Sequence, residues 1–234
     1  MKLKDKVALV TGGGRGIGKA IALAYAREGA RLAICARTAP EIGETEKEIK
    51  ALGVECLGLV CDVSLEEPVH KLVETLQEHF GRMDVLVNNA GVMTRPVPIA
   101  ELEVKKWDYT MAVNLRGPFL VTKAVLPVMM RQKSGAIINV SSSIGRVAYP
   151  NFGAYAASKW GIEGFTQTLA AEVRSYNIRV NSVEPGYVAT KLTGYRGTNP
   201  ESVTEVFVYL AADDSEGVTG KMLSSSGWKR EIKS

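Results

Sequence analysis

Glycine fills five of the seven positions from 12 to 18, between an apolar run at 7–10 and a helical stretch at 17–28. A strand that enters a helix through glycines can turn tightly, and a phosphate can approach its backbone closely. The amino end of the helix adds N–H groups without helical partners and a partial positive charge. The sequence therefore predicts a strand–turn–helix unit that binds the phosphates of a nucleotide.

Apolar runs alternate with helical stretches along the rest of the chain. We expect strands at 7–10, 31–36, 54–60, 83–87, 136–140 and 178–183. We expect helices at 17–28, 40–52, 68–80, 104–132, 155–176 and 201–212. Apolar strands separated by helices are typical of a parallel sheet that is covered on both faces. Because the sequence has no repeat or linker, residues 1–234 are expected to form a single α/β domain, a doubly wound Rossmann-type sheet.

Two other interpretations of the glycine loop stay open. Residues 13–19 also fit the P-loop pattern G-x-x-x-x-G-K, but Ala20 stands where a P-loop carries Ser or Thr for Mg²⁺. No later strand ends in an obvious Walker-B aspartate. A plain glycine-rich turn is the other alternative. Magnesium-dependent ATP binding would separate a nucleotide triphosphatase from a dinucleotide-binding protein.

The end of the second expected strand indicates which dinucleotide is bound. An NAD site usually has a carboxylate roughly 20 positions beyond the glycine loop, for the ribose 2′-hydroxyl. Residues 34–38 contain no carboxylate, but they include Arg37, and a guanidinium matches a 2′-phosphate. Arg15, inside the loop, could reach the same phosphate. We therefore favour NADP(H) over NAD(H), the alternative being two surface arginines that tolerate either cofactor.

Composition gives no support for other classes of partner. The net charge of +4 and the dispersed Lys and Arg do not indicate nucleic acid or an anionic membrane. No apolar run approaches a membrane span or a signal sequence, so we expect a cytoplasmic protein. The three cysteines and two histidines do not match a metal-ligand spacing, and we expect no metal site.

Tyr155 and Lys159 stand one helical turn apart in the helix expected at 155–176, so their side chains are expected to be adjacent. A nearby ammonium favours the phenolate and lowers the pKa of a tyrosine from its ordinary value near ~10. Such a tyrosine can give a proton to a carbonyl oxygen or take one from an alcohol. The pair indicates an acid–base catalyst, although the same spacing also occurs in ordinary helices.

With these features the chain resembles the short-chain dehydrogenase/reductase family, and within it the 3-oxoacyl-[acyl-carrier-protein] reductases. The resemblance is good for residues 5–190 and looser beyond them. Seven motifs occur in the family's order: T-G-x-x-x-G-x-G at Thr11, Gly12, Gly16 and Gly18, then Asp62-Val63, Asn88-Asn89-Ala90-Gly91, Asn114, a serine, Tyr155 with Lys159, and Pro185-Gly186 with Thr190. The family spacing selects Ser142 as the serine, rather than Ser141 or Ser143.

The resemblance implies catalytic roles for four of these residues. Ser142 is expected to hydrogen-bond the substrate oxygen, and Tyr155 to donate the proton. Lys159 is expected to lower the tyrosine pKa and to hold the nicotinamide ribose, and Asn114 to anchor a water that relays protons. The residues expected to contact the cofactor are Gly12, Arg15, Gly16, Ile17, Gly18, Arg37, Asp62, Val63, Asn89, Ala90, Gly91, Tyr155, Lys159, Val188 and Thr190.

The implied activity is that of an NADP(H)-dependent oxidoreductase (EC 1.1.1.-) acting on a small-molecule carbonyl or alcohol. A reductase of 3-oxoacyl thioesters or a broad carbonyl reductase fits the resemblance. A sugar or polyol dehydrogenase of the same fold is an alternative. A non-catalytic NADP-binding redox sensor is another, but it has no need of a tuned phenol.

The chain departs from the family pattern after Thr190. The family commonly has a helical substrate lid there, but here residues 191–200 lead directly into the helix expected at 201–212. We expect a shortened lid and an open pocket, because a lid normally encloses the substrate. The segment 222–228 is expected to replace the family's usual final strand, which carries a glycine pair.

The resemblance also implies a homodimer or homotetramer. In this family the helices that carry Asn114 and the catalytic tyrosine commonly form the subunit interface. Phe119, Val125, Phe165 and Leu169 are the candidate interface residues, with packing in the core as the alternative.

Overall fold

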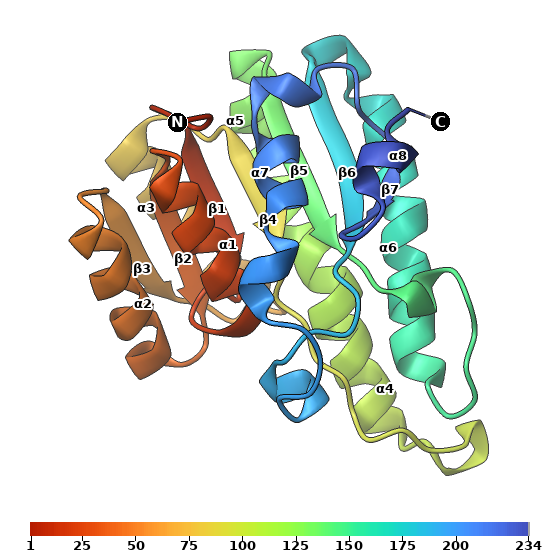
Figure 1. Ribbon diagram of the computed structural model, residues 1–234. Helices are drawn as coiled ribbons and strands as arrows, with labels where there is room; N and C mark the ends of the chain where they lie inside the picture. Colours follow the sequence, from red (N-terminus) through yellow and green to blue (C-terminus); the bar gives the residue numbers. More distant parts are fainter. Residues whose placement is uncertain (234) are drawn as a thin grey trace.

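The computed structural model describes residues 1–233, and they fold around one parallel sheet. Its strand order is β3-β2-β1-β4-β5-β6-β7 (Figure 1). The strands are β1 Val7–Thr11, β2 Arg31–Ala36, β3 Cys56–Val60, β4 Val85–Asn88, β5 Gly135–Val140, β6 Ile178–Glu184 and β7 Met222–Ser224. The order reverses between β1 and β4. In doubly wound sheets, ligands bind outside the carboxyl ends of the strands at that reversal.

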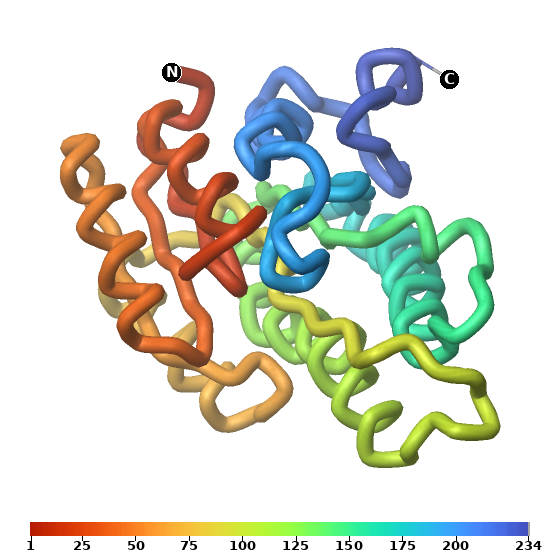
Figure 2. Tube along the Cα trace, turned by 60° about the horizontal axis from the view of Figure 1, so that its bottom comes forward, coloured from red at the N-terminus to blue at the C-terminus, as the bar shows by residue number. Residues whose placement is uncertain are grey.

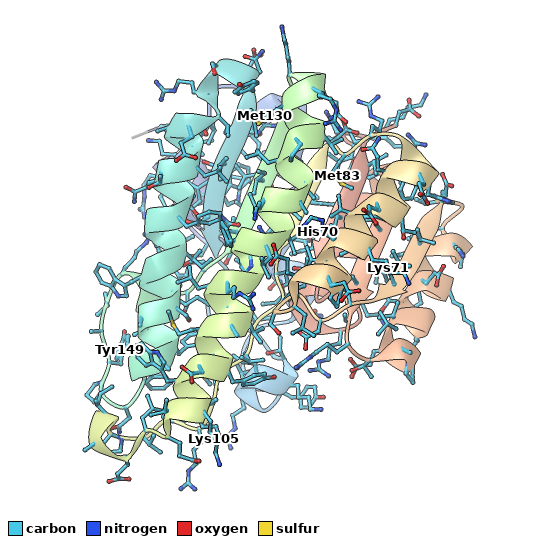
Figure 3. The ribbon with its side chains drawn as sticks, turned by 180° about the vertical axis from the view of Figure 1, so that it is seen from behind. His70, Lys71, Met83, Lys105, Met130 and Tyr149 are labelled. Carbon is cyan, nitrogen blue, oxygen red and sulfur yellow. The ribbon has the colours of Figure 1, made fainter. Side chains whose placement is uncertain are left out.

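Helices cover both faces of the sheet, as the sequence predicted. One face packs against α1 Gly16–Arg27, α2 Ala39–Ala51, α7 Glu205–Ala211 and the short α8 Trp228–Glu231. The other face packs against α3 Glu66–Phe80, α5 Gly117–Gln132 and α6 Gly153–Glu172. Figure 3 shows these three helices side by side, with α4 Val104–Met111 extending the line of α5.

Two apolar cores lie between the sheet and its helices. In β1, Ala8 and Val10 belong to the core that includes α1, whereas Val7 and Leu9 belong to the core that includes α3 and α5. Because both faces of each central strand are buried, the strands read as continuous apolar runs rather than alternating ones.

The helix expected at 104–132 is interrupted. The five residues 112–116 form a π-helical turn between α4 and α5. Such a turn inserts an extra residue, so local backbone groups lose their regular helical partners, and it is frequent at functional sites. Asn114, one of the residues implied by the family resemblance, lies in this turn.

Two expectations for the C-terminal part were inaccurate. A final strand is present, because β7 pairs with Ser182–Glu184 of β6 as a parallel edge strand. The helix expected at 201–212 begins only at Glu205, after a 3₁₀ turn at Pro200–Val203. Short strands and turns of this kind depend on the neighbouring strand or loop, which a local pattern does not contain.

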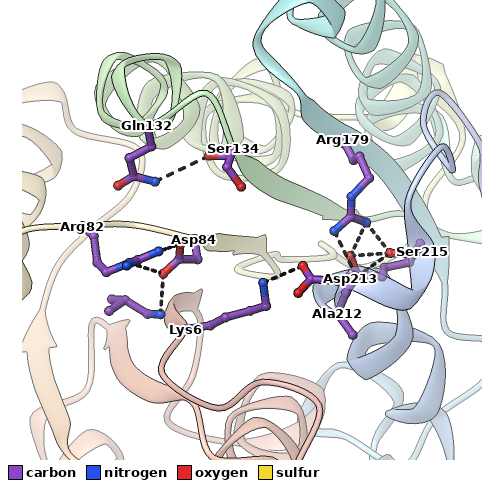
Figure 4. A network of polar contacts seen from close by, with 11 residues as sticks. Lys6, Arg82, Asp84, Gln132, Ser134, Arg179, Ala212, Asp213 and Ser215 are labelled. Atoms are coloured by element: carbon purple, nitrogen blue, oxygen red, sulfur yellow. Dashed lines mark hydrogen bonds and ion pairs between the residues drawn. The ribbon is translucent and has the colours of Figure 1, made fainter.

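The amino ends of the strands are held by polar contacts within the protein (Figure 4). Lys6 lies 2.8 Å from Asp213, and Arg82 lies 2.7 Å from Asp84. Arg179 donates to the carbonyl oxygens of Leu210 and Ala212 and to the hydroxyl of Ser215 (Figure 4). Of these residues, Arg179 joins β6 to the chain at the end of α7 and beyond it. The opposite edge of the sheet holds the carboxyl ends of the strands, and Figure 2 brings it forward.

Candidate active site

A cavity of about 430 Å³ opens at the carboxyl edge of the sheet. The glycine loop, the chain that follows β2 to β6, and the first turns of α6 form its walls. Of the residues predicted from sequence, those that line it are Gly12, Arg15, Gly16, Ile17, Arg37, Asp62, Val63, Asn89, Ala90, Gly91, Ser142, Tyr155, Lys159, Val188 and Thr190. Gly18 and Asn114 do not line it. The structure thus brings the two predicted groups, cofactor-binding and catalytic, into one cavity.

The glycine loop is shaped by its backbone and fixed to the loop after β4. Gly12 and Gly16 have φ values of +66° and +55°, which favour glycine. Thr11 Oγ1 accepts hydrogen bonds from the backbone N–H groups of Asn89 and Ala90, each at 3.0 Å. The Asn89 amide donates to the Thr11 carbonyl oxygen at 2.8 Å. The loops on the two sides of the strand reversal therefore form one rigid unit.

The start of α1 suits a phosphate group. No side chain caps this helix end, which leaves its first N–H groups facing the loop. Gly18 serves packing rather than contact with the cavity, because a Cβ there would overlap the Gly12 carbonyl oxygen and the Asn89 amide. These two observations fit the close approach of a dinucleotide pyrophosphate to the loop.

Lys19 does not serve as a P-loop lysine. Its Nζ lies 2.9 Å from Glu48 and 3.6 Å from Glu44, both on α2. The lysine is thus directed to a neighbouring helix rather than to the glycine loop. Together with Ala20, this geometry argues against the nucleotide triphosphatase interpretation.

Arg37 spans the end of the cavity where β2 and β3 finish. Its Nη1 donates to Tyr109 Oη at 2.8 Å and lies 3.9 Å from Asp62 Oδ2. The guanidinium also lies over the Tyr109 ring, 5.8 Å from the centroid. These contacts hold a positive charge at the position where a ribose 2′-substituent is expected.

Arg15 lines the same end of the cavity, but it has an acidic partner. Its Nη1 lies 2.7 Å from Glu41, a residue of the first turn of α2 that also lines the cavity. Both groups are substantially exposed, so this ion pair is weak and can be exchanged for a phosphate.

Asp62 and Val63 follow β3 directly, as the family motif requires. Asp62 Oδ1 accepts hydrogen bonds from the backbone N–H and the hydroxyl of Ser64, at 3.0 and 2.7 Å. These bonds form a local turn that presents Asp62 to the cavity beside Arg37. Val63 is buried and packs against Gly117 at the start of α5.

Asn114 lies behind the cavity wall and joins three elements. Its Oδ1 accepts from the backbone N–H of Val92, and its Nδ2 donates to the Val92 carbonyl oxygen, both at 2.8 Å. The Nδ2 also donates to Ser158 Oγ on α6 at 3.2 Å. The amide therefore positions the chain after β4 against the catalytic helix. Relay of protons through a water held at Asn114 remains a prediction.

Ser142 caps a 3₁₀ turn, Ser143–Gly145, that follows β5. Its Oγ accepts a long hydrogen bond of 3.3 Å from the backbone N–H of Ile144 and also lines the cavity. A hydroxyl has one donor as well as its acceptor sites, so the Ser142 O–H can be donated to the neighbouring Tyr155 oxygen or to a ligand oxygen.

Tyr155 and Lys159 lie on the same face of α6, with Lys159 Nζ 5.6 Å from the centre of the tyrosine ring. Burial raises the pKa of the Tyr155 phenol, and the neighbouring Ser142 hydroxyl opposes that rise. The expected lowering of the pKa by Lys159 is not found. Burial also lowers the pKa of Lys159 to about 8. Its Nζ donates to the Val140 carbonyl oxygen at 2.8 Å.

The far wall of the cavity is the segment 185–193. Val188 pairs with Thr198 as an isolated bridge, and the Thr190 N–H donates to Thr193 Oγ1 at 3.1 Å. The hydroxyl of Thr193 in turn donates to the Val188 carbonyl oxygen at 2.6 Å. The chain after Thr190 therefore closes on itself as a compact turn.

Comparison with known proteins decides the family. The family model for short chain dehydrogenases matches residues 6–201. A 3-oxoacyl-[acyl-carrier-protein] reductase from Thermotoga maritima is 37% identical over 243 residues, covering 97% of this chain and 98% of the relative. The chain belongs to the short-chain dehydrogenase/reductase family. It is therefore an oxidoreductase whose family uses nicotinamide cofactors, with the Rossmann-type fold that the sequence predicted.

Solved structures of short-chain dehydrogenases with either cofactor are similar to this one. NAD⁺-bound xylitol dehydrogenase has a TM-score of 0.91 at 32% identity, covering 96% of this chain and 98% of its own. A short-chain dehydrogenase from Shigella flexneri 2a complexed with NADP has a TM-score of 0.91 at 29% identity, covering 96% and 98%. The fold is thus common to both cofactor types, and side chains at the adenosine end must distinguish them.

The active-site cavity of this short-chain dehydrogenase includes residues that the motifs did not indicate. They are Gly14, Thr38, Glu41, Cys61, Val92, Met93, Val113, Ser141, Lys191, Leu192 and Thr193, among others. Most of these residues are next to a predicted residue in the sequence, so the positions around the predicted residues could have indicated them. Glu41 had no such signal, because the approach of α2 to the glycine loop is a tertiary contact.

Two of the four candidate interface residues of this short-chain dehydrogenase lie in the core. Val125 is fully buried and Leu169 is almost so, and both belong to the core beneath α3, α5 and α6. Phe119 remains exposed at 46%, and Phe165 is partly buried. Trp160, which the sequence analysis did not single out, is 52% exposed on α6. Within residues 1–233, no helix is long and apolar enough to cross a membrane.

Proposed function

We propose that the protein is an NADP(H)-dependent reductase of carbonyl compounds, with 3-oxoacyl thioesters as the first candidate substrates. One observation carries this proposal: Ser142, Tyr155 and Lys159 line the same cavity as the glycine loop and Arg37. The relative from Thermotoga maritima supports the thioester, because its name specifies a 3-oxoacyl group. The similarity to xylitol dehydrogenase supports a polyol substrate as the alternative.

The bound nicotinamide would supply a hydride, and the protein would supply orientation and the proton. Ser142 donates a hydrogen bond to the substrate oxygen. Tyr155 gives its proton to that oxygen as negative charge develops there. Because burial raises the pKa of Tyr155, the phenol is protonated at neutral pH, which is the form that reduction needs. Oxidation of an alcohol requires the phenolate and is therefore expected to need a higher pH.

The remaining predicted residues would hold the cofactor. The N–H groups at the start of α1 suit its phosphates, and Arg37 with Arg15 suits a 2′-phosphate. Lys159 would hold the nicotinamide ribose, and Val188 with Thr190 would hold the amide. The turn that follows Thr190 is a short wall rather than a lid, since Leu192 and Tyr195 are exposed at 38% and 72%. An open cavity of this kind fits an extended substrate better than it fits a small substrate that must be enclosed.

Nicotinamide fluorescence tests this proposal directly. The purified protein is titrated with NADPH and, separately, with NADH, and acetoacetyl-CoA is then added. We expect NADPH to bind more tightly than NADH and to be oxidised when the ketone is added. Tight binding without oxidation of NADPH by acetoacetyl-CoA, sugars or small carbonyls would favour the redox sensor. Failure of both cofactors to bind would overturn the assignment of the glycine loop.

We also propose that the exposed aromatic residues of α5 and α6 form a homodimer or homotetramer interface. The double variant Phe119→Glu/Trp160→Glu is expected to halve the mass of the assembly or release monomers, because buried carboxylates without partners are costly. Sedimentation velocity measures this, with Leu52→Glu on the far side as the control. A monomeric wild-type protein, or a double variant with unchanged mass, would contradict the proposal.

A further inference from the structure

A buried carboxylate lies one helical turn beyond Lys159 on α6. Tyr155, Lys159 and Glu163 follow one another at intervals of four residues, so they occupy a single face of the helix. Glu163 is 7% exposed and Lys159 is 5% exposed. A carboxylate so deeply buried is rare unless another group stabilises its charge. The reaction scheme above assigns no role to Glu163.

The carboxyl group of Glu163 is held by a residue of β6. Ser182, a fully buried residue of β6, donates its hydroxyl to Glu163 Oε2 at 2.7 Å. A hydrogen bond donated to a carboxylate stabilises the charged form. The other oxygen, Oε1, has no hydrogen-bond partner within residues 1–233.

Lys159 is the group that such a charge would affect. Burial lowers the pKa of Lys159, and the negative charge of Glu163 opposes this lowering. The only other titratable group beside the lysine on its own helix is Tyr155. The elements packed against this part of α6 present neutral groups: the Val140 carbonyl oxygen, the Ser141 and Ser142 hydroxyls, and the Asn114 amide through Ser158. The charged residues of α4, at 105, 106 and 108, are exposed.

We propose that Glu163 is a positioning residue that acts as the counter-charge of Lys159 and keeps it as an ammonium ion. A buried ammonium without an opposite charge would lose its proton to water near neutral pH. The lysine would then carry no charge to attract the developing phenolate of Tyr155, and it would have two N–H donors instead of three, one of which is already donated to the Val140 carbonyl oxygen. The catalytic significance rests on the function proposed above, whereas the coupling between the two charges does not.

Titration of Lys159 in the free protein tests this coupling. In Glu163→Gln the amide oxygen still accepts from Ser182, while the charge is removed. Lysine labelled with ¹³C at Cε is followed by NMR against pH, and Lys159→Arg assigns the resonance. We expect Glu163→Gln to lower the pKa of Lys159 by about one unit, at the low end of the effect of an adjacent opposite charge. Glu172→Gln, an exposed position of the same helix, is expected to cause no change.

The pH dependence of activity is a second measurement, and it would not shift if Glu163 had a purely structural role. As pH rises, kcat/KM falls when Lys159 loses its proton, so in Glu163→Gln this decline is expected about one pH unit lower than in the wild type. Glu163→Asp keeps the charge, so in this variant kcat/KM is expected to decline close to the wild-type pH. An unchanged pKa of Lys159 in Glu163→Gln, or an equal shift in Glu172→Gln, would overturn the proposal.

The wild-type protein gives a test that does not depend on the folding of a variant. The ¹³C resonance of the Glu163 carboxyl group is expected to show an ionised carboxylate at pH 7, and a protonated carboxyl there would overturn the proposal. Because neither titration uses cofactor or substrate, a protein that fails to reduce carbonyls can still show the coupling.

Discussion

Replacing Tyr155 with phenylalanine is expected to lower kcat by about 10³-fold, within the range for loss of a general acid. The variant removes the phenol that lies on α6 beside both Ser142 and Lys159, and it retains the ring. The Kd for NADPH should change by less than about threefold, because the phosphate-binding loop and Arg37 are untouched. Stopped-flow absorbance of NADPH measures kcat, and fluorescence titration measures the Kd.

Tyr176→Phe is the matched control for this substitution. Tyr176 lies beyond the carboxyl end of α6, where it packs against the core away from the cavity. The control should retain wild-type kcat. If Tyr155→Phe kept kcat within a few-fold of the wild type, another group would have to donate the proton, and the catalytic assignment would fail.

Replacing Arg37 with aspartate is expected to weaken NADPH binding by about 100-fold. The substitution removes a charge-assisted hydrogen bond worth about 1.5–3 kcal/mol and places a carboxylate against the 2′-phosphate. NADH, which has a 2′-hydroxyl, should bind equally well or a few-fold more tightly, since a carboxylate accepts a hydrogen bond from that group. Fluorescence titration with each cofactor gives the two Kd values.

Arg31→Asp makes the same change of charge at the amino end of β2, the strand that Arg37 follows, and outside the cavity. It should leave the ratio of the two Kd values unchanged. If Arg37→Asp also left that ratio unchanged, the 2′-phosphate would have to be recognised elsewhere, and Arg15 would be the next residue to replace. The Glu41 carboxylate, 2.7 Å from Arg15, would then decide how readily that arginine is released.

The sequence predicted the sheet and the cavity wall because both depend on short local patterns. Apolar runs of four to seven residues indicated the strands, and the glycine loop indicated the phosphate site, which the structure places beside the reversal of the strand order. The residue that follows each strand was then placed at one edge by the parallel arrangement alone. Arg37 was found in this way, whereas Asp62 and Asn89 were indicated by the family resemblance.

What the sequence could not predict depends on contacts between distant segments. Arg37 is held by Tyr109, which lies 72 residues away, and Arg15 by Glu41 on another helix. The π-helical turn at 112–116 had no signal in the local pattern, and the Asn114 side chain within it bonds to Val92 and Ser158, which are distant in the sequence. Likewise, the pKa values of Tyr155 and Lys159 are dominated by burial, which spacing along a helix does not reveal.

Transfer of isotope from the cofactor tests the central claim most directly. The protein is incubated with acetoacetyl-CoA and NADPH that carries deuterium at both positions of nicotinamide C4, and the product is analysed by mass spectrometry. We expect one deuterium in each molecule of 3-hydroxybutyryl-CoA, with Tyr155→Phe forming almost none. A protein that binds NADPH but transfers no deuterium to this ketone, or to a panel of other carbonyls, would contradict the assignment of Ser142, Tyr155 and Lys159 as catalytic residues.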